Sequence, residues 1–244
     1  MVASSNTLVL ITGANQGIGF ETARKLGTEH KDYHIIVSGR RENAIKEAVS
    51  KLQELGVSAE PLVMDQASDE SIAAAVKEVD VRHGRLDVLI NNAAVNMGTP
   101  TRETWQTLYN INVFGVAMVT DAFIPLLEKS DKVKRIVNVT SGLGSCALTK
   151  IEPNCIYGSK MPEFIIYSSS KAALNLMTVH YAARFEEKGW KINLACPGYC
   201  ATNLNNYGGT NDPATGAINP CRLATLGEDG ETGTFSHKDG PYPW

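Results

Sequence analysis

In "LVLITGANQGIGFETARKL" (8–26) a strand pattern, a glycine-rich turn and a helix pattern follow one another without a gap. The first five residues are largely apolar and predict a buried β-strand. The segment 17–29 has the residue spacing of an amphipathic helix. Because Gly13, Gly17 and Gly19 lie where these two elements meet, the chain is expected to reverse direction there within a few residues.

The spacing of these glycines is G-x-x-x-G-x-G, which differs from the G-x-G-x-x-G fingerprint of dinucleotide-binding folds. The physical roles are the same. The first glycine allows a tight turn, the second lets a pyrophosphate approach the backbone, and the third lets the helix pack on the strand. The helix N-terminus also presents free N–H groups to phosphate. We therefore expect a dinucleotide site here, with a purely structural turn as the alternative. The expected contacts are Gly13, Asn15, Gln16, Gly17, Ile18 and Gly19.

Similar apolar runs recur along the chain and alternate with amphipathic segments. Strands are predicted at 8–12, 34–38, 59–63, 86–91, 135–140 and 191–196, and helices at 17–29, 42–55, 69–83, 101–129 and 166–188. Continuous apolar runs indicate strands buried on both faces. This order predicts an α/β fold of the Rossmann type, a doubly wound parallel sheet flanked by helices, with residues 1–244 in a single domain. The tail 203–244, rich in Asn and Gly at its start, is expected to be a loop or mobile lid.

Composition argues against several classes of protein. The chain has 244 residues, of which 43% are hydrophobic, and a formal net charge of −3, so no nucleic-acid partner is expected. We find no run of about 18 apolar residues and expect no membrane span. The N-terminus lacks the basic segment of a secretory signal. Five cysteines without a CxxC pair indicate free thiols, and five scattered histidines indicate no metal site. These features predict a cytoplasmic protein.

The end of the second predicted strand, "IIVSGRRE" (35–42), indicates which cofactor the turn would take. In this fold an acidic residue near that position commonly binds the ribose 2′-hydroxyl. Here Gly39 occupies it, and Arg40 and Arg41 follow. Guanidinium groups suit a 2′-phosphate by charge and by geometry, which favours NADP(H) over NAD(H). The alternative is a pair of solvated arginines at a helix start.

Six motifs in a fixed order now resemble one family. They are "TGANQGIG" (12–19), "NNAA" (91–94), "NVFG" (112–115), "VTS" (139–141), "YSSSK" (167–171) and "PGYCAT" (197–202). Together they resemble the short-chain dehydrogenase/reductase family, most closely its carbonyl-reductase-like members and related fungal proteins. The resemblance covers essentially the whole chain.

The resemblance implies four catalytic residues, which are Asn112, Ser141, Tyr167 and Lys171. Asn112 is preferred to its neighbours because it begins N-x-x-G. Ser141 directly follows a predicted strand, and Ser145 is the reserve. Tyr167 and Lys171 also count among the expected cofactor contacts.

Elementary chemistry supports the tyrosine and the lysine independently. Positions i and i+4 share one face of a helix, so Tyr167 and Lys171 can point into one cleft. A phenol with a pKa of about 10 is a poor acid at neutral pH, and a nearby ammonium favours its phenolate. The phenol would then give a proton to a carbonyl oxygen that Ser141 holds by a hydrogen bond. The family implies that Asn112 acts through a bound water to complete a proton path to Lys171.

The resemblance also implies further cofactor contacts. Asp65, with Gln66 beside it, corresponds to the adenine contact, although Asp65 could instead cap the next helix. "NNAA" has Ala94 where the family usually has glycine, which requires ordinary backbone angles there. A reactive thiol at Cys200 is the less favoured alternative to a backbone contact. The remaining expected contacts are Asn92, Ala93, Pro197, Gly198, Cys200 and Thr202.

Two segments, 142–165 and 199–215, are expected to surround the substrate. In the first, Leu143, Leu148, Ile151, Ile156, Met161 and Phe164 either wall a pocket or form the core of a surface loop. The segment precedes a helix that related proteins use for pairing, so monomer and homo-oligomer both remain open. We expect an NADPH-dependent reductase of a small apolar ketone, aldehyde or quinone. The alternatives are a non-catalytic NADP(H)-binding regulatory protein and a biosynthetic enzyme acting on a specialised metabolite.

Overall fold

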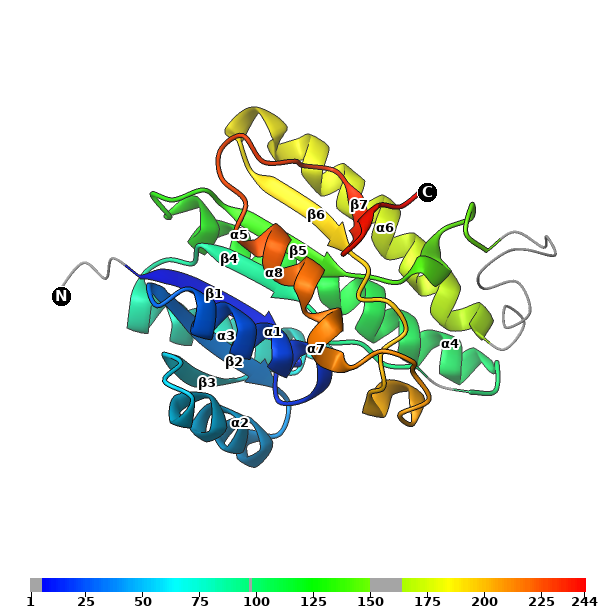
Figure 1. Cartoon of the computed structure of the whole chain (residues 1–244), viewed down its shortest axis with the longest axis horizontal. Coiled ribbons are helices and arrows are strands. Elements are labelled where there is room, and N and C mark those ends of the chain that lie inside the picture. Colours follow the sequence, from blue (N-terminus) through cyan, green and yellow to red (C-terminus); the bar gives the residue numbers. More distant parts are fainter. Residues whose placement is uncertain (1–5, 97, 150–163) are drawn as a thin grey trace.

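The computed structural model describes residues 6–96, 98–149 and 164–244. In this part of the chain a single sheet runs in the strand order β3-β2-β1-β4-β5-β6-β7-β8 (Figure 1). All pairs are parallel except β7 with β8. The strands are β1 (Thr7–Thr12), β2 (Tyr33–Gly39), β3 (Ala59–Val63), β4 (Val88–Asn91), β5 (Arg135–Val139), β6 (Lys191–Ala195), β7 (Phe235–His237) and β8 (Gly240–Pro241). The predicted Rossmann-type sheet is thereby confirmed.

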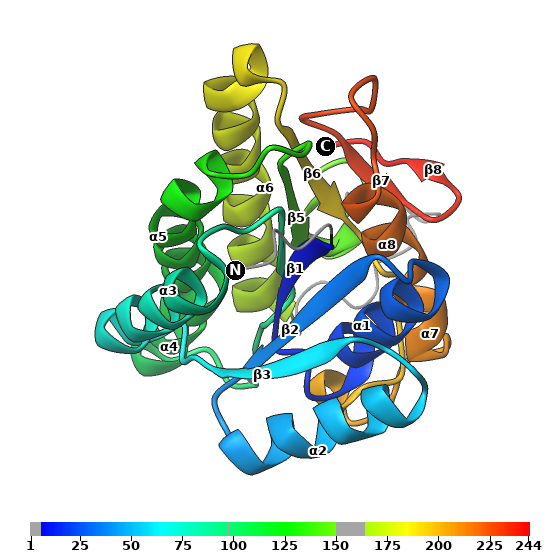
Figure 2. The ribbon, with the colours of Figure 1, turned by 90° about the vertical axis from the view of Figure 1, so that its left-hand side faces the viewer.

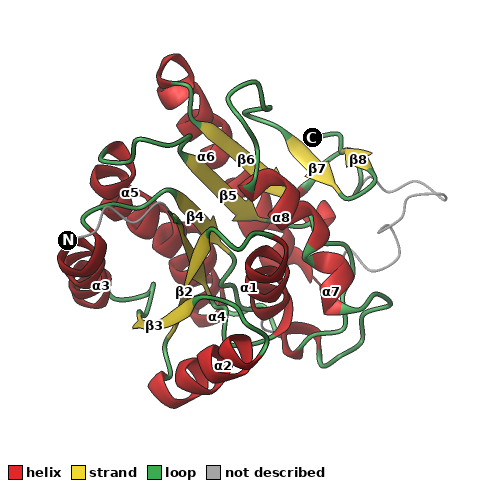
Figure 3. Cartoon of the chain, turned by 60° about the vertical axis from the view of Figure 1, so that its left-hand side comes forward, coloured by secondary structure: helices red, strands yellow, loops and turns green. Residues whose placement is uncertain are grey.

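Helices cover both faces of this sheet, as Figures 2 and 3 show. They are α1 (Gly17–Glu29), α2 (Glu42–Glu54), α3 (Asp69–His83), α4 (Arg102–Tyr109), α5 (Val116–Glu128), α6 (Ile165–Phe185), α7 (Pro213–Gly216) and α8 (Ile218–Ala224). Neighbouring residues of β1 point to opposite faces. Val9 and Ile11 join the core beneath α1, α2 and α8, whereas Leu8 and Leu10 join the core beneath α3, α5 and α6. This two-sided burial explains why the strand runs are continuously apolar.

The sheet reverses its order between β1 and β4. From β1 the chain builds outward through β2 to β3, then returns to place β4 on the other side of β1. In open parallel sheets the loops at such a reversal point diverge and leave a crevice at the carboxyl ends of the strands. The glycine turn after β1 and the loop after β4 both lie at that crevice.

The tail 203–244 is more ordered than the predicted loop or lid. It contains a short 3₁₀ turn (Asn203–Asn205), α7 and α8, and its last part adds β7 beside β6 with Phe235 paired to Leu194. Phe235 is buried, and α8 contributes Leu223 to the core. The prediction was incomplete because strands of two or three residues are too short to show a periodic pattern.

The predicted helix 101–129 also differs in detail from the structure. Between α4 and α5 the segment Asn110–Gly115 is a π-helix, a wider turn that is frequent at functional sites. A Cβ atom on Gly115 would lie 2.5 Å from the carbonyl oxygen of Gln66, so only glycine fits where the helix passes the loop after β3.

By length and composition alone, the helical run Arg102–Glu128 is long and apolar enough to cross a membrane. Half of its most apolar window is buried inside the fold. On that side Val119, Phe123 and Leu127 pack beneath the sheet with residues of α3 and α6. A core helix passes the same test of length and hydropathy, and the packing of α5 is that of a core helix.

Replacing Phe123 with alanine is expected to destabilise the fold strongly. The side chain is fully buried between α5 and the sheet, so its removal loses burial energy and leaves a cavity. The free energy of unfolding should fall by about 3–5 kcal/mol. Val81→Ala is the control, because Val81 is 79% exposed and its loss should change stability by no more than about 0.5 kcal/mol. Urea unfolding followed by circular dichroism compares the two, and equal midpoints would contradict the assigned core.

Candidate active site

A cavity of ≈ 640 Å³ opens at the carboxyl ends of the parallel strands. Its walls come from the glycine turn after β1, the ends of β2 and β3, the loops after β4, β5 and β6, and the start of α6. All of the predicted catalytic and cofactor-binding residues line this cavity except Gly19 and Asn112. Residues from seven separate segments therefore meet in one place, which no local pattern in the sequence shows.

The glycine turn forms a narrow cradle. Gly13 and Gly17 have φ angles of +63° and +57°, a region that side chains disfavour. A Cβ atom on Gly19 would lie 2.5 Å from Nδ2 of Asn92, which itself donates to the carbonyl oxygen of Thr12. Gly19 thus lets α1 pack against the loop after β4, whereas the sequence predicted close packing of the helix on the strand. The side chain of Gln16, the N-cap residue of α1, makes no capping hydrogen bond, so the first N–H groups of α1 remain available to a phosphate.

The end of β2 offers positive charge beside this cradle. Arg40 and Arg41 are exposed and line the cavity, and neither takes part in an ion pair among the described residues. A Cβ atom on Gly39 would lie 3.1 Å from Oδ1 of Asn15. An acidic side chain at that position would therefore crowd the side-chain amide of Asn15, whereas Arg40 and Arg41 bring positive charge to this part of the cavity.

Asp65 and Gln66 follow β3 and behave differently from each other. Asp65 lines the cavity, and its Oδ1 accepts a hydrogen bond from the N–H of Ala67 at 3.0 Å. It does not cap α3, because Ser68 is the N-cap and accepts from the N–H of Ser71. The helix-cap alternative for Asp65 is therefore wrong.

Gln66 is buried, and its side chain links two segments of the site by hydrogen bonds. Its Nε2 donates to the carbonyl oxygens of Ala93 at 3.1 Å and Ile111 at 2.8 Å. The side chain thus holds the loop after β4 against the π-helix. In that loop Ala94 has no positive φ, since the non-glycine residues with positive φ in the described chain are Asn206 and Tyr207. The ordinary backbone expected at Ala94 is confirmed.

Tyr167 and Lys171 lie one turn apart at the start of α6 and both line the cavity. Nζ of Lys171 is 5.7 Å from the centroid of the Tyr167 ring and donates a 2.9 Å hydrogen bond to the carbonyl oxygen of Val139. Burial of this ammonium lowers the pKa of Lys171 to about 8, although the neighbouring Cys196 opposes the shift. The lysine therefore keeps most of its positive charge at neutral pH and loses it in mildly alkaline solution.

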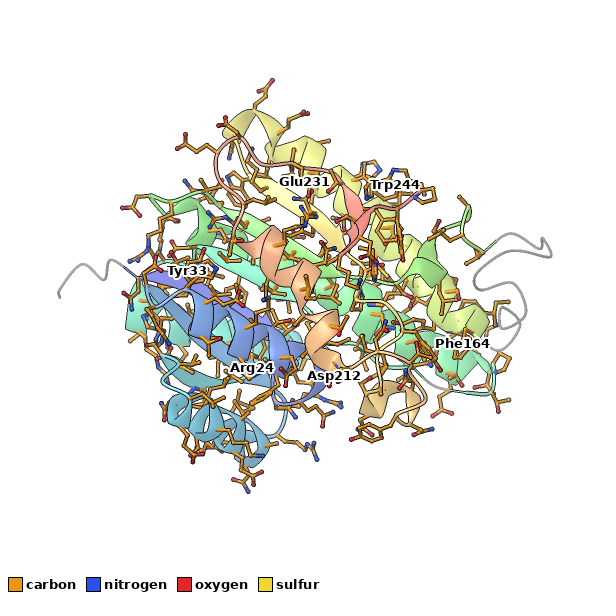
Figure 4. The ribbon with its side chains drawn as sticks, in the orientation of Figure 1. Arg24, Tyr33, Phe164, Asp212, Glu231 and Trp244 are labelled. Carbon is orange, nitrogen blue, oxygen red and sulfur yellow. The ribbon has the colours of Figure 1, made fainter. Side chains whose placement is uncertain are left out.

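The structure separates the two candidate serines. Ser141 follows β5, lines the cavity, and accepts from the N–H of Leu143 at 3.1 Å. Ser145 is buried, and its hydroxyl donates to the carbonyl oxygen of Pro243 at 2.7 Å. The adjacent Ala147 donates to the carbonyl oxygen of Trp244, which Figure 4 labels at the chain end. Ser145 thus fastens the C-terminal segment, and only Ser141 reaches the site.

Asn112 lies behind the cavity, in the π-helix, and is completely buried. Its side-chain amide makes a pair of 2.9 Å hydrogen bonds with the backbone of Val95 and donates to the hydroxyl of Ser170 at 3.2 Å. Ser170 in turn donates to the carbonyl oxygen of Tyr167. Asn112 therefore connects the loop after β4 to the helix that carries Tyr167 and Lys171.

The sequence analysis missed Asn175 and Gly144. Nδ2 of Asn175 donates to the carbonyl oxygen of Gly144, and its Oδ1 accepts from the hydroxyl of Thr140 at 2.6 Å. These bonds bind both flanks of Ser141 to α6. One signal was available, because Asn175 follows Lys171 by four residues and so continues the face defined by Tyr167 and Lys171.

Cys200 is buried in the loop after β6, and its Sγ donates to the carbonyl oxygen of Pro197. Burial raises the pKa of the Cys200 thiol to about 11, and Cys196 and Asp212 add to the shift. Such a thiol stays protonated and is a poor nucleophile, which argues against the reactive-cysteine alternative. Close by, Thr202 packs near Gly17, where a Cβ atom would lie 3.4 Å from its Cγ2.

Apolar and aromatic side chains also line the cavity. Leu143 and Phe164 come from the segment predicted to wall the substrate, whereas Leu148 does not line the cavity. Ile151, Ile156 and Met161, also predicted there, lie outside the described residues. The segment 199–215 adds Tyr199, Leu204 and Tyr207, side chains that the sequence analysis did not single out.

Comparison with known proteins agrees with this geometry. The family model described as short chain dehydrogenase matches residues 7–212. The chain is 41% identical over 237 residues to the short-chain dehydrogenase anuI of Penicillium roqueforti, covering 95% of this chain and 93% of that protein.

Two solved structures are also similar. A structure of actinorhodin polyketide ketoreductase with NADPH has a TM-score of 0.81 and 26% identity, covering 97% of both chains. The structure of salutaridine reductase from Papaver somniferum has a TM-score of 0.82 and 24% identity, covering 94% of this chain and 99% of that one, and supports the fold alone. The matches and the arrangement of Ser141, Tyr167 and Lys171 lead to one conclusion: the chain belongs to the short-chain dehydrogenase/reductase family, whose members are oxidoreductases.

Proposed function

We propose that this protein is an NADPH-dependent reductase that converts a small apolar ketone, aldehyde or quinone to the corresponding alcohol or hydroquinone. The observation that carries the proposal is the convergence of Ser141, Tyr167 and Lys171 on one cavity whose other end is the glycine cradle. Cofactor binding alone would not require the Ser141 hydroxyl beside the tyrosine and the buried ammonium. The complete set therefore speaks against a purely regulatory role.

The chain's own residues fit an NADP(H) molecule. The cradle of Gly13 and Gly17 and the uncapped start of α1 suit the pyrophosphate. Arg40 and Arg41 suit the 2′-phosphate, since they line the cavity at the position where an acid would favour NAD(H). Asp65 fits the adenosine end. The bound nicotinamide supplies the hydride.

Ser141, Tyr167 and Lys171, at the end of the cavity opposite the glycine turn, carry out the proton transfer. The Ser141 hydroxyl holds the carbonyl oxygen by a hydrogen bond while Tyr167 gives that oxygen its proton. The carbonyl carbon gains the hydride, so the product is an alcohol and Tyr167 is left as a phenolate. The buried Lys171 ammonium stabilises that phenolate, and its hydrogen bond to Val139 keeps it in place.

The shape of the cavity supports an apolar substrate. Leu143, Phe164, Leu204 and Tyr207 line it beyond the catalytic side chains. Such a wall favours a substrate with a hydrocarbon skeleton and one reducible oxygen. Among similar proteins, the polyketide ketoreductase is named for a ketone substrate and was solved with NADPH, which agrees with a ketone of a specialised metabolite.

Tyr167→Phe is expected to abolish the chemistry without harming the fold. The variant keeps the ring but has no proton to give, so the rate of carbonyl reduction should fall by about 10²–10⁴-fold. The measurement is the loss of NADPH absorbance with a panel of ketones, aldehydes and quinones. Tyr109→Phe is the matched control, because its ring packs between Trp105 and Phe114 away from the cavity. Equal rates for Tyr167→Phe and wild type would refute the role of the tyrosine.

Arg40→Asp is expected to reverse the cofactor preference. The change removes a partner for the 2′-phosphate and adds a carboxylate suited to a ribose hydroxyl, so NADPH should bind about 10–100-fold more weakly and NADH more tightly. Fluorescence titration with both cofactors measures this. Arg102→Asp makes the same change of charge at an exposed site outside the cavity and should have little effect. An unchanged preference in Arg40→Asp would show that Arg40 does not contact the phosphate.

The rate of reduction should fall as the pH rises through about 8. The pKa of Lys171 is lowered to about 8 by burial, so its ammonium is present below that pH and is lost above it. Without the ammonium the phenolate left on Tyr167 loses its stabilising charge. A profile of kcat/KM against pH for a ketone reports the groups of the free enzyme. In Lys171→Arg, which stays charged, the fall in kcat/KM should begin at a higher pH. A profile for the wild type that stays flat to pH 10 would contradict the assignment.

A further inference from the structure

Far from the cavity, in the described part of the chain, three side chains of the kinds that bind metal ions lie close together. They are His34, the second residue of β2, Glu60, the second residue of β3, and His83, the last residue of α3. They therefore lie at the amino ends of the strands, whereas the cavity lies at the carboxyl ends. Figure 4 labels Tyr33, the residue before His34, at this end of β2.

The register of the sheet brings the three together. Ile36 pairs with Glu60, so His34 and Glu60 lie diagonally on one face of the β2–β3 pair. Ile36 packs into the core beneath α3 and α5, which identifies this as the face that α3 covers. The last turn of α3 then places His83 over the same spot.

The distances suit a small cation. Nε2 of His83 is 2.7 Å from Oε1 of Glu60, and Nε2 of His34 is 3.5 Å from Oε2. The three donor atoms lie within 4.8 Å of one another. Ligands of one tetrahedral zinc ion lie about 3.3 Å apart, given bonds of about 2.0–2.1 Å. Small side-chain rotations therefore suffice to place all three donors on one ion.

His34 is already oriented for this role. Its Nδ1 forms a 2.8 Å hydrogen bond with the hydroxyl of Ser58, the outer contact that commonly fixes a metal-binding imidazole. Its Nε2 is buried and has no hydrogen-bond partner among the residues that the structure describes, because 3.5 Å to Glu60 is too long. A buried ring nitrogen that faces a carboxylate without a hydrogen bond is a position that a cation would satisfy.

The charges around the cluster also tolerate a dication. The carboxylate of Glu60 is partly buried and faces both imidazoles. Arg82 lies 3.6 Å from Glu60, yet it also pairs with Glu78 and donates to the carbonyl oxygen of Pro61. With neutral imidazoles, the two carboxylates and one guanidinium leave a net negative charge.

We propose that His34, Glu60 and His83 form a structural site for a divalent transition-metal cation of the zinc and cobalt class. Two imidazoles and one carboxylate match that class, whereas magnesium and calcium prefer oxygen ligands alone. The ion would fasten α3 to β2 and to the edge strand β3. This departs from the expectation of no metal site, which was based on the wide spacing of the histidines in the sequence.

Cobalt titration of the full wild-type chain, after treatment with a chelator, tests the site directly. We expect one Co²⁺ per chain, with d–d absorption bands and no sulfur-to-metal charge-transfer band. A charge-transfer band would place the ion on a thiol such as the exposed Cys146 and would overturn the proposal. Absence of stoichiometric binding would overturn it equally. This measurement needs no variant and so does not depend on how a variant folds.

Three variants then assign the ligands. Glu60→Gln and His83→Gln should each weaken Co²⁺ binding at least about tenfold, because each removes one of three ligands. His180→Gln, at an exposed position of α6, should leave it unchanged. Zn²⁺ at a hundredfold excess over its Kd should raise the Tm of the wild type by roughly 5 °C or more and that of Glu60→Gln far less. Equal affinities in the wild type and both site variants would refute the assignment.

Discussion

The hydrogen bond from the buried Lys171 ammonium to the carbonyl oxygen of Val139 is the contact around which the catalytic end of the cavity is arranged. It holds the start of α6 against the end of β5. The turn that follows β5 then passes so close to the helix that a Cβ atom on Gly144 would lie 2.8 Å from the backbone carbon of Lys171. Asn175 bonds to both Thr140 and Gly144 from the next turn of α6. The serine between those two residues therefore cannot move independently of the helix.

This arrangement buries the ammonium of Lys171 away from water, which has two consequences. Burial makes the ammonium less favourable, which lowers the pKa of Lys171 to about 8. The same loss of water strengthens its interaction with any negative charge formed on Tyr167. Lys171 therefore keeps its positive charge at neutral pH, and its surroundings let that charge stabilise a phenolate on Tyr167 strongly. Asn112 and Ser170 support it from behind without reaching the cavity themselves.

Much of the fold follows from local patterns. Continuous apolar runs of strand length and helices with a 3.6-residue period are visible along the chain, and their alternation implies a parallel sheet. Short elements were not predictable, because β7 and β8 have too few residues for a period to appear. Nor was the π-helix Asn110–Gly115, whose contacts with Gln66 join residues far apart in the sequence.

The sequence by itself determined the order of the elements, the glycine-rich turn and the helical pair of Tyr167 and Lys171, because each depends on residues close together in the chain. Only the tertiary structure decided between Ser141 and Ser145 and gave Ser68 the helix cap proposed for Asp65. It alone joined His34, Glu60 and His83. The physical reason is that these contacts are set by strand register and by the packing of helices on the sheet, which bring together side chains that no local spacing relates.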